Sequence, residues 1–111
     1  MPITHASTLD YDNKTASFNS SSIDTESGTF FYATLDVDGI ADSGTLDVKI
    51  QSSPDDVNFY DTGVAFAQVT GSTGSESVQL ADGEFHRYVR YAVTIGASSD
   101  YSFMLHSTAR A

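Results

Sequence analysis

The stretch FHRYVRYAVTI, residues 85–95, alternates between apolar and polar side chains and predicts the longest β-strand of this chain. Successive side chains of a strand point to opposite faces, so one face of this strand should be buried and the other solvated. The positions expected to be buried are Val89, Tyr91, Val93 and Ile95. Similar alternation recurs at residues 29–37, 46–51 and 101–108, and shorter strands are expected at 57–60, 64–69 and 77–80.

Turn-forming residues separate these segments. All eight glycines fall between the expected strands or at their ends, where a missing side chain costs least. Asp38-Gly39 should end the strand that begins at Thr29, and Ser53-Pro54-Asp55-Asp56 should form a turn. No helical periodicity extends over ten residues. The chain is therefore expected to be all-β, an antiparallel β-sandwich with a jelly-roll-like fold and seven to nine short strands.

Residues 1–28 differ in composition from the remainder of the chain. Their few apolar side chains are separated by Ser, Thr, Asn and Asp, so this segment cannot build much core alone. We expect residues 1–28 to form an N-terminal arm or edge strands, with short strands near 4–9 and 15–19. Residues 29–111 should form one β-sandwich domain, because a chain of 111 residues is long enough for a single core.

The charge balance excludes several kinds of partner. The chain has 15 acidic and 5 basic residues and a net charge of -10. Nucleic-acid binders displace counterions with Lys and Arg, so neither nucleic acid nor an anionic membrane surface is expected as a partner. No apolar run approaches the roughly 20 residues that span a bilayer, and Met1–His5 lacks the features of an export signal. The absence of cysteine excludes disulfides and cysteine-based zinc sites.

Residue patterns typical of catalysis or metal binding are nearly absent. No Gly-x-Ser-x-Gly motif occurs, and His5, His86 and His106 are too far apart in sequence to suggest a metal site, although His86 and His106 could meet if their strands pair. Asp-rich turns could hold Ca²⁺, but none has the spacing of an EF-hand loop. We therefore expect no enzyme activity, no cofactor and no metal site.

Exposed aromatic side chains would suit a carbohydrate-binding face. Tyr32, Tyr60 and Tyr88 are the candidates for such a role, and the chain has no Trp. The alternative is that most of the 13 aromatic side chains fill the core.

Two arginines on the longest strand are informative because cations are scarce. Strand alternation sends Arg87 and Arg90 to opposite faces. A guanidinium near the interior needs a partner, for which Asp47 and Asp61 are candidates. The other interpretation is contact with an acidic neighbouring protein.

Two segments carry a resemblance to a known group of proteins. LDVKIQSSPDDVNFYD, residues 46–61, followed later by Arg87-Tyr88-Val89-Arg90-Tyr91, resembles small β-sandwich proteins of tailed-bacteriophage virions. This chain departs from the group's pattern at Asp56, where glycine is commoner, and at Phe59, where Trp is commoner. The resemblance implies a non-enzymatic virion structural protein. It favours a capsid decoration or cement protein on the capsid surface, synthesised in the host cytoplasm, that binds the major capsid protein or another virion protein and stabilises the assembled head.

The same hypothesis indicates contact residues. Ile3, Leu9 and Tyr11 could add a strand to an exposed edge on a neighbour, and Arg90 could contact an acidic surface. We also expect a homo-oligomer, with a trimer as the hypothesis. The alternatives that remain open are a tail, neck or adsorption component of a phage, and a carbohydrate-binding module.

Overall fold

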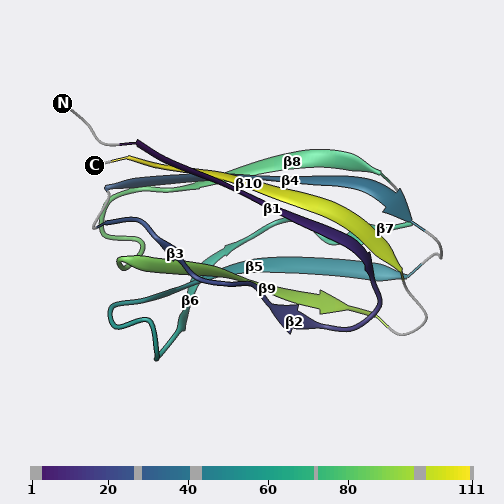
Figure 1. Cartoon of the computed structure of the whole chain (residues 1–111), viewed down its shortest axis with the longest axis horizontal. Helices are drawn as coiled ribbons and strands as arrows, with labels where there is room; N and C mark the ends of the chain where they lie inside the picture. Colours follow the sequence, from purple (N-terminus) through teal and green to yellow (C-terminus); the bar gives the residue numbers. More distant parts are fainter. Residues whose placement is uncertain (1–3, 27–28, 41–43, 72, 97–99, 111) are drawn as a thin grey trace.

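The computed structural model describes residues 4–26, 29–40, 44–71, 73–96 and 100–110. These residues form two antiparallel sheets that face one another, as Figure 1 shows. The strands are β1 (Thr4–Lys14), β2 (Phe18–Asn19), β3 (Ile23–Asp24), β4 (Phe30–Ile40), β5 (Thr45–Ser53), β6 (Tyr60–Ala65), β7 (Val69–Thr70), β8 (Gly74–Leu80), β9 (Tyr88–Ile95) and β10 (Tyr101–Arg110). Among the described residues, no helix is long and apolar enough to cross a membrane.

The strand order is that of a jelly roll. Sheet A has the order β1-β10-β4-β8, and sheet B has the order β2-β9-β5-β6, with β3 also on β9 and β7 also on β5. If β2 with β3 and β6 with β7 each count as one interrupted strand, the first strand pairs with the last, the second with the second last, and so on inward. The protein is therefore an all-β sandwich of the expected class. Its chain pairs as one long antiparallel hairpin that is folded over into two sheets, as in a jelly roll.

Strand alternation places the core between the two sheets. The inward positions of the four central strands are buried, which confirms the predicted faces of 29–37, 46–51, 85–95 and 101–108. The buried side chains on these strands include Phe31, Leu35, Leu46, Ile50, Val89, Tyr91, Val93, Phe103 and Leu105. Because strands from both sheets supply these residues, the core is continuous through the sandwich.

Several strand predictions were wrong in detail. The strand expected at 85–95 begins only at Tyr88, and with 8 residues it is shorter than β1 and β4, which have 11 each. Residues 57–59 are not in a strand, because the turn after Pro54 continues to Phe59 and β6 begins only at Tyr60. The expected strand at 64–69 is divided between the end of β6 and the short β7. Asp38-Gly39 does not end β4, because a bulge opposite Ser102 and Phe103 lets the strand continue to Ile40.

The described part of residues 1–28 forms edge strands of both sheets. β1 pairs with β10 from Thr4 opposite Arg110 to Lys14 opposite Tyr101. β2 and β3 cross to sheet B and pair with β9. Leu9 and Tyr11 are partly buried and pack against the core of their own sandwich, so in this fold they are not side chains of a free arm. Ile3 lies outside the described residues.

Candidate interaction surface

The connection between β5 and β6 is a turn built around one carboxylate. Asp55 Oδ1 accepts hydrogen bonds from the backbone N–H groups of Asn58 (2.9 Å) and Val57 (3.0 Å) and from Ser53 Oγ (2.8 Å). Its Oδ2 accepts a bond from Asn58 Nδ2 at 3.0 Å. These bonds, led by the one from the Asn58 backbone, hold the pKa of Asp55 well below its usual range. Asp55 is therefore ionised at neutral pH, the state in which its carboxylate accepts all of these bonds.

This turn exposes apolar side chains. Val57 is 77% exposed and Tyr60, the first residue of β6, is 58% exposed. Figure 1 shows the turn projecting beyond the strands of sheet B. Tyr is enriched in protein interfaces, so an exposed Tyr60 at the end of this turn is a candidate interface residue, with the exposed Val57 close to it in the chain.

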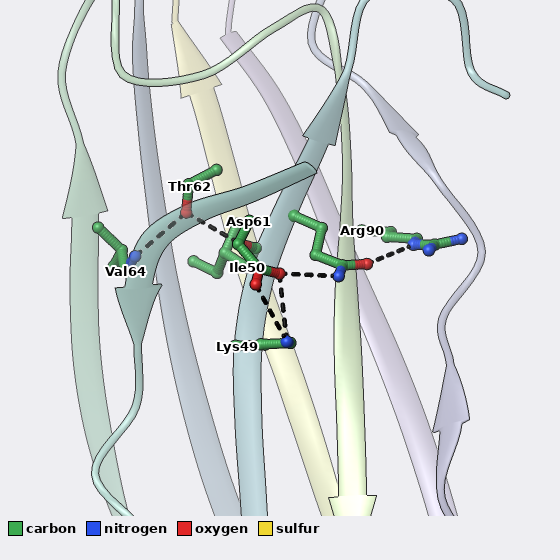
Figure 2. Close-up of polar contacts among 7 residues, drawn as sticks. Lys49, Ile50, Asp61, Thr62, Val64 and Arg90 are labelled. Atoms are coloured by element: carbon green, nitrogen blue, oxygen red, sulfur yellow. Dashed lines mark hydrogen bonds and ion pairs between the residues drawn. The ribbon is translucent and has the colours of Figure 1, made fainter. Parts of the chain in front are cut away.

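Phe59 and Arg90 connect the turn to the outer face of sheet B. The Arg90 guanidinium carbon lies 4.0 Å from the centre of the Phe59 ring, which is a cation–π contact. Arg90 Nε donates to Gln51 Oε1 at 2.9 Å, and Gln51 Nε2 in turn donates to Asp61 Oδ1 at 2.9 Å. Figure 2 shows this chain of contacts running across β9, β5 and β6 to Lys49. We call Val57, Phe59, Tyr60 and Arg90 together the loop surface. Tyr60 pairs with Ser52 and Arg90 with Gln51, so Tyr60 and Arg90 reach this end of the molecule from opposite faces of sheet B.

The charges beside the loop surface are mostly paired. Lys49 Nζ lies 3.2 Å from Asp61 Oδ1, and both side chains are about half exposed, so the pair adds little stability. The hydrogen bond from Gln51, followed by that from Lys49, lowers the pKa of Asp61. Arg90 makes no ion pair with any residue in the described part of the chain, and its two terminal amino groups make no hydrogen bond there. A guanidinium held by stacking and by its Nε thus keeps its planar fork available for a carboxylate.

Arg87 has the opposite character. Its Nε and Nη2 donate to the two carboxylate oxygens of Asp24 at 2.8 and 2.9 Å. This bidentate bond raises the pKa of Arg87. The expected partners were wrong, because Asp61 bonds to Lys49 and Gln51 and Asp47 accepts a bond from Gln68 Nε2. The Arg87–Asp24 ion pair links the start of β9 to β3. Arg90 is therefore the better candidate of the two for contact with another protein.

The bulge in β6 sets the position of Asp61. The register shifts between the positions opposite Lys49 and Gln51, and Gly63 takes a positive φ of 86° there. Thr62 Oγ1 donates to the Ile50 carbonyl at 2.8 Å and accepts a bond from the Val64 N–H at 3.2 Å (Figure 2). These bonds satisfy backbone groups that the interrupted ladder would leave unpaired.

The three candidate sugar-binding tyrosines do not form one platform. Tyr32 is 41% exposed on the outer face of β4 in sheet A, whereas Tyr60 and Tyr88 belong to strands of sheet B. Tyr88 is partly buried, and the Arg87 guanidinium carbon lies 5.2 Å from the centre of its ring. A shared stacking face for a glycan is therefore not built from these three residues.

The histidines and acidic residues also stay apart. His106 accepts or donates a bond with Thr8 Oγ1 at 3.2 Å on sheet A, whereas His86 precedes β9 of sheet B, so the two do not meet through strand pairing. In the described residues, no group of three or more His, Asp or Glu side chains could hold a metal ion. The hollows are shallow: one of 310 Å³ on the outer face of sheet B has Asp47, Lys49 and Thr94 in its lining.

The sequence predicts Arg90 as a contact residue and Tyr60 as an exposed aromatic residue, but it does not predict that Val57 and Phe59 belong to the same surface. Val57 and Phe59 were assigned to a strand, although Ser53 and Asp55 on either side of Pro54 already carry the signal for a turn closed by side chains. The stacking of Arg90 on Phe59 joins positions 31 residues apart, so no local pattern could have indicated it.

Comparison with known proteins supports the fold and goes no further. No family model matches the chain, and no curated protein matches it. Among solved structures, it is similar to a chain described under "Bacillus endospore appendages form a novel family of disulfide-linked pili". The TM-score is 0.56 and the sequence identity 17%, and the match covers 98% of this chain and 86% of the other. At that identity the likeness shows a common fold alone.

Proposed function

We propose that this protein is a non-enzymatic structural protein of a tailed-phage virion, a capsid decoration or cement protein that binds the assembled head. The observation that carries the proposal is the loop surface: Val57 and Tyr60 are exposed at one end of sheet B, and Arg90, on the outer face of that sheet, makes no ion pair with a described residue. The sequence resemblance at residues 46–61 and 87–91 supplies the virion context.

The loop surface is suited to a protein partner. Tyr and Arg are enriched among the residues that dominate interface energies, and a turn already held by Asp55 loses little freedom on binding. A partner that covers this end of sheet B could offer an apolar pocket to Tyr60 on one face and a carboxylate to Arg90 on the other. On the head surface, the natural candidate is the major capsid protein.

The proposed mechanism is mass action. A protein that binds the assembled shell, and not its separated subunits, shifts the equilibrium toward the shell by an amount set by its concentration relative to its dissociation constant. At 100 times that constant the stabilisation is about 2.7 kcal/mol for each site. No chemical step at this protein is required.

To test whether the partner is the head, the protein is added to heads that were assembled in its absence, from the virus that carries this gene. The proposal predicts saturable cosedimentation with heads at a fixed ratio to the major capsid protein. Isolated tails serve as the comparison, and a glycan array covers the carbohydrate-binding alternative. Binding to tails alone, or to glycans and not to heads, would contradict the decoration role.

A second candidate is a subunit of a filamentous appendage. It is favoured by the structural likeness to a chain from disulfide-linked pili over nearly the whole chain. This protein has no cysteine, so its filaments would have to be held by non-covalent contacts alone. Electron microscopy of the concentrated protein separates the two candidates, since filaments favour the appendage and discrete particles favour decoration.

A further inference from the structure

The edges of the two sheets are protected unequally. An edge strand carries unpaired backbone groups that can pair with another chain, and proteins commonly block this with short strands, bulges or inward-pointing charges. On sheet B, one edge consists of β2 and β3, which have two residues each, and the other contains the bulged β6. On sheet A, the edge strand β8 carries Glu76 at an inward position, and its Oε1 accepts a bond from the Ala67 N–H at 2.8 Å.

The remaining edge, β1, lacks such protection along most of its length. β1 has 11 residues and, among the described residues, pairs with β10 alone (Figure 1). Its register on β10 is regular from Thr4 to Tyr11, and a shift occurs only between Tyr11 and Lys14. No proline and no inward-pointing charge lies between Ala6 and Tyr11. Leu9 and Tyr11 face inward but are only partly buried, so a strand added beside β1 would cover them further.

We propose that β1 pairs with β1 of a second copy of this chain, antiparallel and across a two-fold axis at Leu9. The two copies would then share one continuous sheet made from both sheets A. This inference goes beyond the proposed function and does not rest on it.

The sequence of β1 suits this pairing. With the axis at Leu9, Leu9 lies opposite its own copy, Thr8 lies opposite Asp10, and Ser7 lies opposite Tyr11. The inward side chains Leu9 and Tyr11 would extend the apolar layer across the contact, and no charged side chain would face a like charge. An axis at Asp10 would instead place two carboxylates opposite each other. Pairing beyond Tyr11 is limited by the bulge.

Closure follows from the symmetry. A two-fold contact uses the same edge on both copies, so it gives a closed dimer and not a filament. It also differs from the trimer that the sequence suggested. Each copy carries a net charge of -10, so long-range repulsion opposes pairing and added salt should strengthen the dimer.

The register can be tested by introducing a charge at the exposed Thr8. The dimer dissociation constant of each variant is measured by sedimentation velocity of the full chain over a range of concentrations. Thr8→Asp places a carboxylate opposite Asp10 of the other copy twice in each dimer, and should weaken dimerisation about fivefold. Thr8→Lys places an ammonium there and should strengthen it about fivefold. The double variant Thr8→Asp with Asp10→Lys should restore the affinity lost in Thr8→Asp.

Matched controls lie on the other edge of the same sheet. Ser77 is exposed on β8, and its substitutions to Asp and Lys should leave the dimer constant unchanged. Circular dichroism melts establish that each variant is folded. A monomer at millimolar concentration in 0.5 M salt overturns the proposal, as does a dimer that Thr8→Asp and Thr8→Lys shift in the same direction or not at all.

Discussion

At the scale of single residues, two buried tyrosines of the core differ in how their hydroxyls are satisfied. Tyr91 and Tyr101 are both fully buried. The Tyr101 hydroxyl donates to the Gly44 carbonyl and accepts a bond from the Gly71 N–H at 3.3 Å. The Tyr91 hydroxyl has no well-formed hydrogen bond to a described residue, although Ser107 lies near enough to act on its pKa, which burial raises.

This contrast predicts opposite effects of the same substitution. Tyr101→Phe should lower the free energy of unfolding by about 0.5–1.5 kcal/mol, because it removes the hydrogen bonds to the Gly44 carbonyl and from the Gly71 N–H. Tyr91→Phe should leave that free energy unchanged or raise it by up to about 1 kcal/mol, because it removes a poorly satisfied polar group. Urea denaturation of the two variants provides the measurement. Equal destabilisation by both would show that the two hydroxyls are equally satisfied.

Asp55 gives the loop surface a distinct dependence on pH. Its pKa is lower in the folded protein than in the unfolded chain, so its contribution to the turn is complete above the ordinary value of 3.8. That contribution is lost only as pH falls further, through the lowered pKa of the folded state. The amide resonances of Val57 and Asn58 should therefore stay unchanged from pH 7 to about pH 4, as followed by NMR. A titration of these amides centred at the ordinary value would contradict the arrangement.

At the scale of elements, polar side chains attach residues 18–26 to sheet B. The Ser20 N–H donates to the Tyr91 carbonyl at 2.9 Å, and Ser20 Oγ accepts a bond from the Tyr91 N–H at 2.8 Å. Thr25 contributes a similar pair of bonds to the Arg87 carbonyl, from its N–H and its Oγ1. A segment with few apolar residues thus docks through hydrogen bonds between the buried Ser20 and Thr25 and the backbone of Tyr91, in β9, and of Arg87, just before it.

The prediction at this scale compares two adjacent serines. Ser20→Ala should lower the free energy of unfolding by about 1–3 kcal/mol, because the buried Tyr91 N–H loses its acceptor. Ser21→Ala should change it by less than about 0.5 kcal/mol, because that side chain is exposed. Chemical denaturation under the same conditions compares the two. If Ser20→Ala were as stable as Ser21→Ala, hydrogen bonding from Ser20 would not hold the segment.

The strands differ in how far sequence could predict them. In β4, β5, β9 and β10, the two-residue period follows directly from burial of one face, and the predicted inward positions are buried. The conformation of residues 54–59 could not be predicted from the two-residue period. Val57 and Phe59 alternate with polar residues as in a strand, but hydrogen bonds to Asp55 hold residues 55–58 in a turn. The edge position of β1 depends on pairing with β10, about 100 residues away in the chain, and no local pattern encodes such a contact.

For the candidate surface, sequence could identify single residues but not their neighbours. Arg90 stood out because cations are scarce, and Asp24 could not be recognised as the partner of Arg87 from 63 positions away. The grouping of Arg90 with Phe59 and Gln51 arises from three adjacent segments of sheet B.

At the scale of the whole molecule, the protein is an acidic β-sandwich whose loop surface exposes apolar side chains. The net charge of -10 keeps the exterior soluble and disfavours nonspecific association, so specific contacts must overcome it locally. Within the described residues, the two most exposed large apolar side chains, Val57 and Tyr60, both lie at the loop surface. Under the proposed function, we therefore expect binding to be concentrated at the loop surface and not on the outer face of sheet A.

The most direct test measures how tightly two tyrosine variants bind to assembled heads. Both variants must first be shown to be folded. Tyr60→Ala removes the exposed ring of the loop surface, and Tyr32→Ala removes a comparably exposed ring from sheet A. Under the proposed function, Tyr60→Ala should weaken binding about 30-fold, as expected of an interface residue worth about 2 kcal/mol, while Tyr32→Ala should stay within about twofold of the unmodified protein. Full binding by Tyr60→Ala together with a large loss in Tyr32→Ala would contradict the account and place the contact on sheet A.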